Sequence, residues 1–145
     1  MPRWVDEAFA EYAKRMPRTA RLDLVEVRPE RRDEGRTPAQ MLDLEAERIA
    51  AALPSRAKTV ALDERGREFT SAALARWMVG KLEDGIDTAF LVGGPDGLAP
   101  SLKKNADTLM RLSAMTLPHG LARVLLAEQL YRAMSIVQGH PYHRE

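Results

Sequence analysis

Two stretches near the carboxyl end carry residue types that bind ligands or take part in reactions. The first is the run GGPDG at residues 93–97, which follows an apolar run at residues 88–92. Glycines let the backbone approach an adenine or a ribose closely, so that main-chain amides do the recognition. The spacing differs from the G-x-G-x-x-G of dinucleotide binding and from the phosphate loop of ATP enzymes, which disfavours both classes. Glycine and proline also suit a plain tight turn, and that alternative stays open.

The second stretch is the terminal hexapeptide HPYHRE at residues 140–145, which is rich in hydrogen-bond donors. Its two histidines lie three positions apart and are half of a metal site, but no other cluster of His or Cys completes it. We therefore expect no metal. A short tail of this kind is often frayed, which is the alternative to a functional role.

The apolar periodicities and the Gly and Pro breakers predict the elements that position these stretches. Helices are expected at residues 2–16, 38–53, 69–82 and from about 121 onwards. Strands are expected at residues 20–27, 58–62, 88–92 and in an apolar run that ends at 117, with a turn at 63–66. Strands that alternate with helices predict an α/β fold with a parallel-rich sheet covered by helices. Such sheets bind ligands in loops at the ends of neighbouring strands.

Length and composition are those of one soluble globular domain spanning residues 1–145. The chain has 145 residues, of which 45% are hydrophobic and 30% charged. It has no cysteine, which excludes disulfides, zinc–thiolate sites and a cysteine nucleophile. No apolar run approaches the roughly 20 residues that cross a bilayer, and the amino end lacks a signal-peptide pattern. We expect a cytoplasmic protein with no membrane partner.

Charge is nearly balanced over the whole chain but not along it. The net charge is +1, whereas residues 97–145 contain six Lys or Arg, three acidic residues and all three histidines. The carboxyl end is therefore the basic end. A basic end is compatible with contact to nucleic acid, and a solvated charged face is the alternative.

Four segments, taken in order, carry a resemblance to a known family. LVGGPDGL, LSAMTLPH, RVLLAEQLYRA and HPYHRE are similar to segments of the SPOUT-class ribosomal large-subunit (23S rRNA) pseudouridine N3-methyltransferases. The resemblance is close after Phe90 and weaker before Thr59. It implies a C-terminal trefoil knot, a homodimer, and methyl transfer from S-adenosyl-L-methionine to N3 of a pseudouridine. The implied substrate is 23S rRNA within the ribosome or large subunit.

The same resemblance assigns residues to the cofactor. The implied cofactor-binding residues are Leu62, Gly93, Gly94, Leu112, Ser113, Ala114, Met115, Thr116 and Leu117. Beside these, we expect the basic residues His119, Arg123 and Arg132 to bind RNA. Without the family, residues 112–117 are read as a buried strand. His119 is then a packing or capping residue near a helix start, where the helix dipole also favours an anion.

In the related enzymes the terminal motif closes over the methyl-donor site of the partner subunit. The resemblance therefore implies that the catalytic residues are His143, Tyr142 and Arg144. In this reading Tyr142 stacks on or hydrogen-bonds a flipped base, and His143 orients the base or assists proton removal. Arg144 holds a phosphate or the edge of the base. No single obligate general base is evident.

Family members begin with a short strand and a glycine-containing loop ahead of the first helix, and the sequence departs from that pattern. We therefore expect the domain to lack the family's first strand. Two alternatives to the implied function stay open. One is another SPOUT-class methyltransferase that acts on transfer RNA, against which HPYHRE argues. The other is a non-catalytic ribosome-binding module.

Overall fold

The computed structural model describes residues 1–28 and 35–143. Its helices are α1 (Arg3–Arg15), α2 (Pro38–Ala52), α3 (Ser71–Asp84), α4 (Pro100–Asn105) and α5 (His119–Val137). Its strands are β1 (Lys58–Glu68), β2 (Thr88–Leu91) and β3 (Thr108–Arg111), and its short 3-10 helices are η1 (Arg18–Ala20) and η2 (Pro141–His143). Arg144, a predicted catalytic residue, lies outside the described residues.

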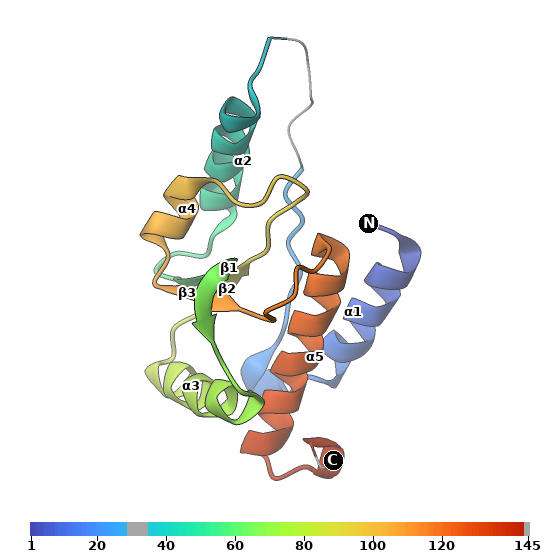
Figure 1. Cartoon of the computed structure of the whole chain (residues 1–145). Helices are drawn as coiled ribbons and strands as arrows, with labels where there is room; N and C mark the ends of the chain where they lie inside the picture. The colour runs from blue at the N-terminus through green and yellow to red at the C-terminus, as the bar shows by residue number, and fades with distance from the viewer. Residues whose placement is uncertain (29–34, 144–145) are drawn as a thin grey trace.

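A parallel sheet forms the middle of the molecule (Figure 1). The strand order is β2-β1-β3, and β1 pairs in parallel with both neighbours. In the two registers Lys58 lies opposite Thr88, and Val60 lies opposite Thr108. α3 connects β1 to β2, and α4 connects β2 to β3. The predicted α/β class, with a parallel sheet covered by helices, is confirmed.

The core has one part on each face of this sheet. Consecutive β1 residues Val60 and Ala61 are both buried, because they point to opposite faces and both faces are covered. On one face Val60 packs with α3 and α5 through residues such as Leu74 and Leu130. On the other face Ala61 packs with Leu98 and with partly buried residues of α2 and α4. The sheet is thus held between two helical layers.

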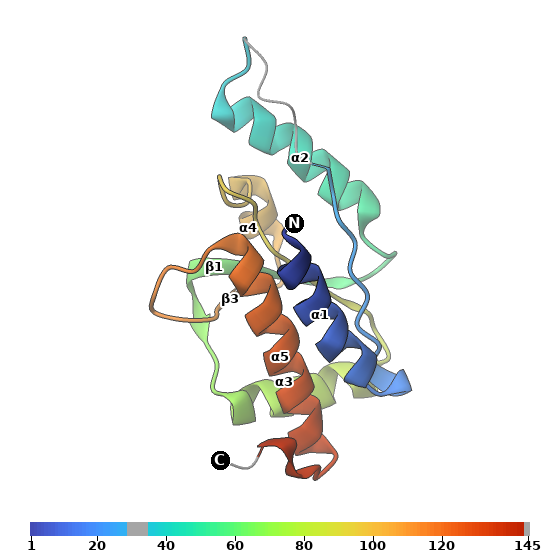
Figure 2. The same ribbon diagram turned by 90° about the vertical axis from the view of Figure 1, so that its right-hand side faces the viewer.

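α1 lies along the outer side of α5 (Figure 2). Val5 is fully buried there, and its side chain lies 3.2 Å from where a Cβ on Gly120 would be. Trp4, the residue before Val5, is 54% exposed. Neighbouring residues point about 100° apart around a helix, so Trp4 and Val5 cannot both face α5.

Local sequence explains where the central helices begin and end. Thr37 forms a capping box with Gln40 at the start of α2, and the Thr70 side chain accepts a hydrogen bond from the amide of Ala73 in α3. Gly85 ends α3 with φ 66, a left-handed conformation that glycine adopts without strain. The predicted ends of these two helices are therefore confirmed to within two residues.

Residues 20–27 do not form the predicted strand. They leave η1 and run extended, and within the described part of the chain no backbone–backbone hydrogen bond reaches residues 21–27. Leu24 and Val25 are 41% and 65% exposed. Alternating side chains predict a strand, but a strand also needs a neighbouring edge to pair with. Whether a strand edge lies beside residues 20–27 depends on the tertiary structure.

The predicted turn at residues 63–66 is also wrong. β1 continues to Glu68 through an irregularity between Leu62 and Arg67 in its pairing with β3. Glycine is required at position 66 for this course. A Cβ there would lie 2.6 Å from the backbone of Met110 and would clash with it. The two strands approach each other more closely than any side chain at this position allows.

The last predicted strand is misplaced. β3 ends at Arg111, and residues 112–118 form a loop that leads to α5. α4 occupies a polar segment for which the sequence predicted no element. Its six residues are fewer than the periodicity argument can detect, because two turns show too little of a helical repeat.

We expect Gly66→Ala to destabilise the fold by about 2 kcal/mol, since the new methyl group forces β1 and β3 apart. Gly80→Ala is the matched control. Gly80 is exposed within α3 and nothing lies within 4 Å of its Cβ position, so alanine should stabilise that helix by up to about 1 kcal/mol. Urea denaturation of both variants measures the difference. Equal stability of the two variants would contradict this account of β1.

Candidate functional site

The candidate site lies at the carboxyl edge of the sheet. β2 leads into residues 92–99, and β3 leads into residues 112–118. Leu62 lies in β1 at the start of the pairing irregularity. Because the strands are parallel, these segments meet at the same edge, and α5 begins there with His119 (Figure 1).

The glycine loop is a tight turn whose close contact is between Gly93 and Gly97. The amide of Gly97 donates to the carbonyl of Gly94 at 2.9 Å, and Gly97 has φ 79. A Cβ on Gly93 would lie 2.7 Å from the carbonyl carbon of Gly97, whereas one on Gly94 would meet nothing within 4 Å. Gly93 therefore holds the loop closed, and Gly94 leaves open space beside it. The sequence did not single out Gly97, although its spacing from Gly93 was visible.

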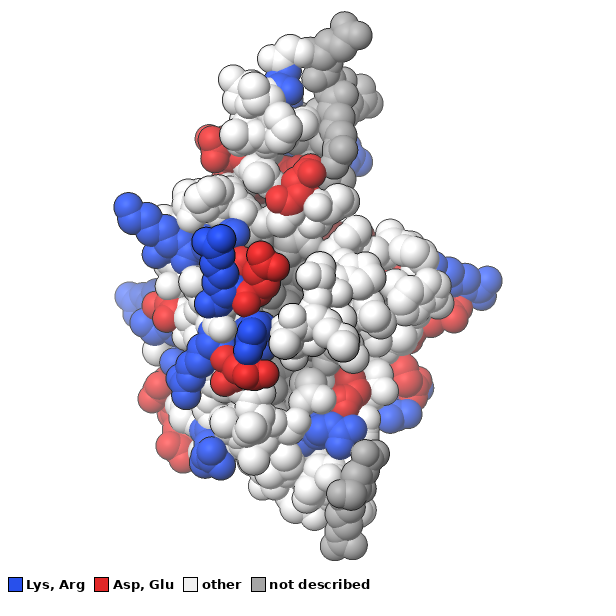
Figure 3. All heavy atoms as spheres, viewed as in Figure 1, with Lys and Arg blue, Asp and Glu red and all other residues white. Residues whose placement is uncertain are grey.

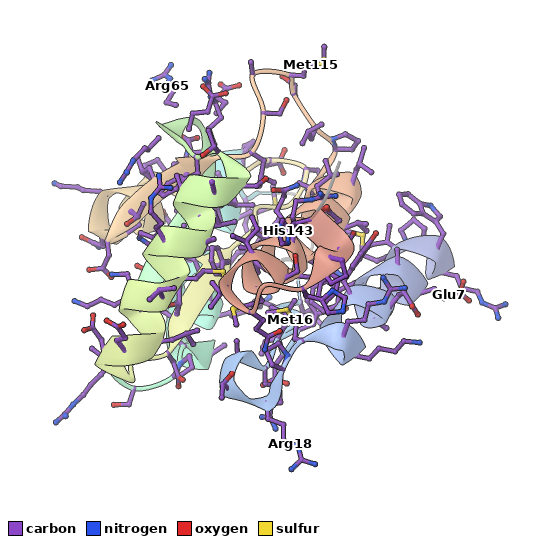
Figure 4. The ribbon with its side chains drawn as sticks, turned by 90° about the horizontal axis from the view of Figure 1, so that it is seen from below. Glu7, Met16, Arg18, Arg65, Met115 and His143 are labelled. Carbon is purple, nitrogen blue, oxygen red and sulfur yellow. The ribbon has the colours of Figure 1, made fainter. Side chains whose placement is uncertain are left out.

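The loop at residues 112–118 is a second, more exposed wall of the site. Leu112, Ser113 and Leu117 are half-buried, whereas Met115 is 78% exposed. The Ser113 hydroxyl accepts a hydrogen bond from the amide of Met115 at 2.9 Å, which fixes the turn of the loop. Figure 4 shows Met115 projecting away from the body of the molecule. The loop thus offers main-chain groups and apolar side chains at an accessible position.

Two cavities border these loops but do not unite them. A large cleft of about 1260 Å³ is lined by Gly93, Gly94, His119 and Arg123 together with many apolar side chains. A small cavity of about 140 Å³ is lined by Leu112 and by residues of β3, α3 and α5. Residues 113–117 line neither. Within one chain the two loops therefore lie at the same edge of the sheet and at the start of α5, but they do not share a cavity.

The predicted RNA-binding arginines are engaged by acidic residues of the same chain. Arg123 is 16% exposed at its side chain and pairs with Glu26 at 2.8 Å and with Asp6 at 3.8 Å. Arg132 pairs with Glu128 at 2.7 Å. Figure 3 shows basic and acidic side chains intermixed over one face of the molecule. The positive charge of these two arginines is thus largely compensated.

The Arg123–Glu26 pair makes the stability of the fold depend on pH under acidic conditions. The hydrogen bond and the positive charge of Arg123 hold the pKa of the Glu26 carboxyl below its ordinary value. A lowered folded-state pKa contributes stability above the unfolded pKa, and this contribution is lost as the pH falls through the folded pKa. When the pH falls below about 4, we expect the melting temperature of wild type to fall further than that of Glu26→Gln. Parallel slopes from pH 7 to pH 3 would contradict the assignment.

The terminal motif lies at the far end of α5 from both loops. Tyr142 and His143 belong to η2, which follows the last turn of α5, whereas the loops lie at its first turn (Figure 1). α5 is about 28 Å long, and Tyr142 packs on Tyr131, which lies about 18 Å along the helix from its first turn. The Nδ1 atom of His143 is buried, and no hydrogen-bond partner for it lies in the described part of the chain. The predicted cofactor and catalytic residues of one chain do not come together.

The described residues give two further observations. They contain no group of three or more His, Cys, Asp or Glu side chains placed to share a metal ion. None of their helices combines the length and the apolar character that a membrane span requires.

Parallel strands, helices on both faces and loops gathered at the carboxyl edge define an α/β ligand-binding domain. The chain belongs to the SPOUT methyltransferases, because the family model described as "Predicted SPOUT methyltransferase" matches residues 1–143.

Several curated relatives match almost the whole chain. A protein of Ralstonia nicotianae is 59% identical over 144 residues, which cover 99% of this chain and 92% of the relative. A protein of Laribacter hongkongensis is 59% identical over 145 residues, covering 100% and 93%. A protein of Nitrosospira multiformis is 56% identical over 144 residues, covering 99% and 92%. Each of the three is named "Ribosomal RNA large subunit methyltransferase H".

Proposed function

We propose that this chain methylates N3 of a pseudouridine in 23S rRNA, with S-adenosyl-L-methionine as methyl donor. The observation that carries the proposal is the 59% identity, over nearly the full length, to relatives named as large-subunit ribosomal RNA methyltransferases. The target atom and the nucleoside come from the four motifs described above. The enzyme then works in the cytoplasm on the ribosome or large subunit, and its trefoil knot is part of the same proposal.

The loops at the carboxyl edge fit an adenosyl group. Open space beside Gly94 lets a ligand approach the loop closely, and a Cβ at position 93 would collide with the loop itself. Leu62, Leu112 and Leu117 are half-buried and supply apolar surface for an adenine. An adenine needs an apolar slot and a few main-chain hydrogen bonds, which this set of residues offers. We propose that these residues, with the intervening loop positions, hold the cofactor.

The separation along α5 supports a site built from two copies of the chain. One chain holds its loops and its terminal motif about 18 Å or more apart along α5, so we propose that the terminal motif acts at another chain's loops. Apolar side chains remain exposed on α5 and on the loop before it. Leu125 and Val137 of α5 are 36% and 39% exposed, and Met115 is 78% exposed. We therefore propose a homodimer in which each chain supplies the tail for its partner's cofactor loops.

In this arrangement the tail residues prepare the RNA base. The cofactor, when bound, supplies a methyl group on a positively charged sulfur. N3 of pseudouridine is an imide nitrogen and a poor nucleophile while protonated, so the protein must favour its anion. Arg144 supplies positive charge for this, and His143 orients the base or accepts the proton. Correct positioning of N3 contributes at least as much as proton removal.

We also propose that the large cleft marks the place of the strand that the resemblance expects ahead of α1. The cleft runs between β2 and the extended residues 20–27, and Met1 lies on its wall. Lys58 donates to the carbonyl of Asp87, so the alternate residues Thr88 and Phe90 direct their backbone groups to the opposite, open side. An additional parallel strand there would pair with the open side of β2 and with residues 20–27. The chain would still form a single domain.

Labelled methyl transfer tests the function. Ribosomes from cells that lack the matching activity, free 23S rRNA and transfer RNA are each incubated with the protein and labelled S-adenosyl-L-methionine. We expect label on ribosomes or large subunits, with much less on naked RNA, because a small net charge gives weak binding to RNA alone. Label on transfer RNA would favour the other SPOUT-class activity. Cofactor binding without transfer to any RNA would favour a non-catalytic module.

A further inference from the structure

All three tyrosines of the chain meet in one cluster, although they come from three different elements. Tyr12 lies near the end of α1, Tyr131 in the second half of α5, and Tyr142 in η2. The rings of Tyr131 and Tyr142 have centroids 4.5 Å apart with planes tilted by 34°. The rings of Tyr12 and Tyr131 have centroids 6.3 Å apart. Tyr131 thus stands between the first helix and the terminal motif.

Cations complete the cluster. The guanidinium of Arg15 lies 5.6 Å from the ring centroid of Tyr12 and 5.8 Å from that of Tyr131. The guanidinium of Arg132 lies 5.1 Å from the ring centroid of Tyr142. Both arginines are fixed by carboxylates of their own helices, at 2.7 Å in each case. A cation held over an aromatic ring is attracted to it, so the ring of Tyr142 is engaged by its own chain.

The backbone after α5 brings the tail to this cluster. Gly139 has φ 68, which reverses the chain at the helix end. The amide of His140 then donates to the carbonyl of Ser135 at 2.8 Å. The amide of Tyr142 donates to Nδ1 of His140 at 3.3 Å. The terminal motif is therefore folded back onto α5 and is not a frayed end up to His143.

The hydroxyl of Tyr142 also interacts within the cluster. Burial, a hydrogen bond with Tyr12 and the negative charge of Glu128 raise the pKa of Tyr142 to about 12. This side chain therefore remains protonated at neutral pH. His143 follows directly, and Figure 4 shows it over the end of α5.

We infer that Tyr142 is an anchor and not the residue that stacks on the substrate base, and that Tyr12 and Tyr131 are positioning residues. By holding Tyr142, they fix the position from which His143 acts at the partner's loops in the proposed homodimer. The inference rests on the proposed methyltransferase function. It revises the sequence-based role of Tyr142, whose ring already has its stacking partner in Tyr131.

The test compares Tyr131→Ala with its matched control Tyr131→Phe, which keeps the ring. Two readouts need no activity: release of terminal residues by carboxypeptidase, followed by intact mass, and ultraviolet titration of tyrosine. For Tyr131→Ala we expect faster release, loss of the titration step near pH 12, and at least about a tenfold lower kcat on ribosomes. Its dissociation constant for S-adenosyl-L-methionine should stay unchanged. Tyr131→Phe titrates one tyrosine fewer, but it should keep the step near pH 12, the tail release and the kcat of wild type.

A double-variant cycle tests whether Tyr131 acts through Tyr142. If Tyr131 acts only through Tyr142, then Tyr131→Ala combined with Tyr142→Ala lowers kcat no more than the more damaging single change. Losses that multiply would overturn the inference, since they would show that Tyr142 contributes independently of its anchor. Unchanged tail release in Tyr131→Ala would overturn it as well.

Two further controls keep the result interpretable. If Tyr131→Ala fails to fold, Tyr12→Phe removes a single hydroxyl and should still lower the titration point of Tyr142. An unshifted titration point would contradict the role of Tyr12. If the wild-type protein transfers no methyl group to any RNA, the proposed function fails, whereas the release and titration experiments still decide whether the cluster anchors the tail.

Discussion

Replacing Gly93 by alanine is expected to weaken binding of S-adenosyl-L-methionine by about thirtyfold. The new Cβ would lie 2.7 Å from the carbonyl carbon of Gly97 and 2.9 Å from its Cα, and both are backbone atoms that cannot rotate away. Overpacking of this kind costs about 2 kcal/mol, and the loop must open to relieve it. Calorimetric titration of the purified protein with the cofactor measures the change in affinity.

Gly94→Ala is the control for this prediction. It adds the same methyl group one residue later, where nothing lies within 4 Å. The melting temperature of Gly94→Ala should match wild type, and any loss of affinity should be the smaller of the two. If Gly93→Ala binds the cofactor as wild type does, then the glycine loop is only a turn and does not carry the site.

Paired chains with different defects should recover activity that each lacks alone. Gly93→Ala damages the loops and His143→Ala damages the tail, and these regions lie at opposite ends of α5. In a dimer containing one chain of each kind, the intact loops of one chain meet the intact tail of the other. One of two sites is then complete, so we expect about half of the wild-type kcat per dimer. Two affinity tags isolate the mixed dimer for the measurement.

The matched control places both changes in one chain. A dimer of wild type with the double variant Gly93→Ala, His143→Ala pairs each intact part with a damaged one, so it should be inactive. A site contained within one chain predicts the reverse: half activity for this control and none for the mixed singles. The two arrangements therefore decide whether the site is shared, without any structure of the complex.

The sequence was sufficient for the elements whose signals are local. Thr37, Thr70 and Gly85 carry capping and stop chemistry that acts within a few residues, and the helices they bound are where they were expected. The alternation of strands and helices likewise predicted a parallel sheet. These features require no knowledge of distant contacts.

The misplaced elements depend on contacts between distant residues. Residues 20–27 have the alternation of a strand but no edge to pair with among the described residues. Asp63 to Gly66 reads as a turn, yet Gly66 lets β1 continue against Met110, which is 44 positions further along the chain. Side-chain pattern alone cannot reveal either outcome, because both are decided by the neighbouring strand.

Residues for the candidate site could be proposed from the sequence, but their arrangement could not. The family motifs named the glycine loop, the following loop and the terminal motif. The resemblance implied that the terminal motif acts at the partner's site, but not that α5 is the element that holds it away from both loops of its own chain. Nor did the resemblance reveal that Tyr142 is stacked on Tyr131, since aromatic residues 11 positions apart on a helix and a tail give no periodic signal.

The most direct measurement is identification of the nucleoside that the protein makes. Ribosomes from cells without the matching activity are treated with the protein and S-adenosyl-L-methionine, and digested 23S rRNA is analysed by mass spectrometry. The account predicts N3-methylpseudouridine with wild type and its loss with His143→Ala, while His143→Ala still binds the cofactor. A methylated nucleoside other than N3-methylpseudouridine, or none at all from a folded protein that binds the cofactor, would contradict the proposed function.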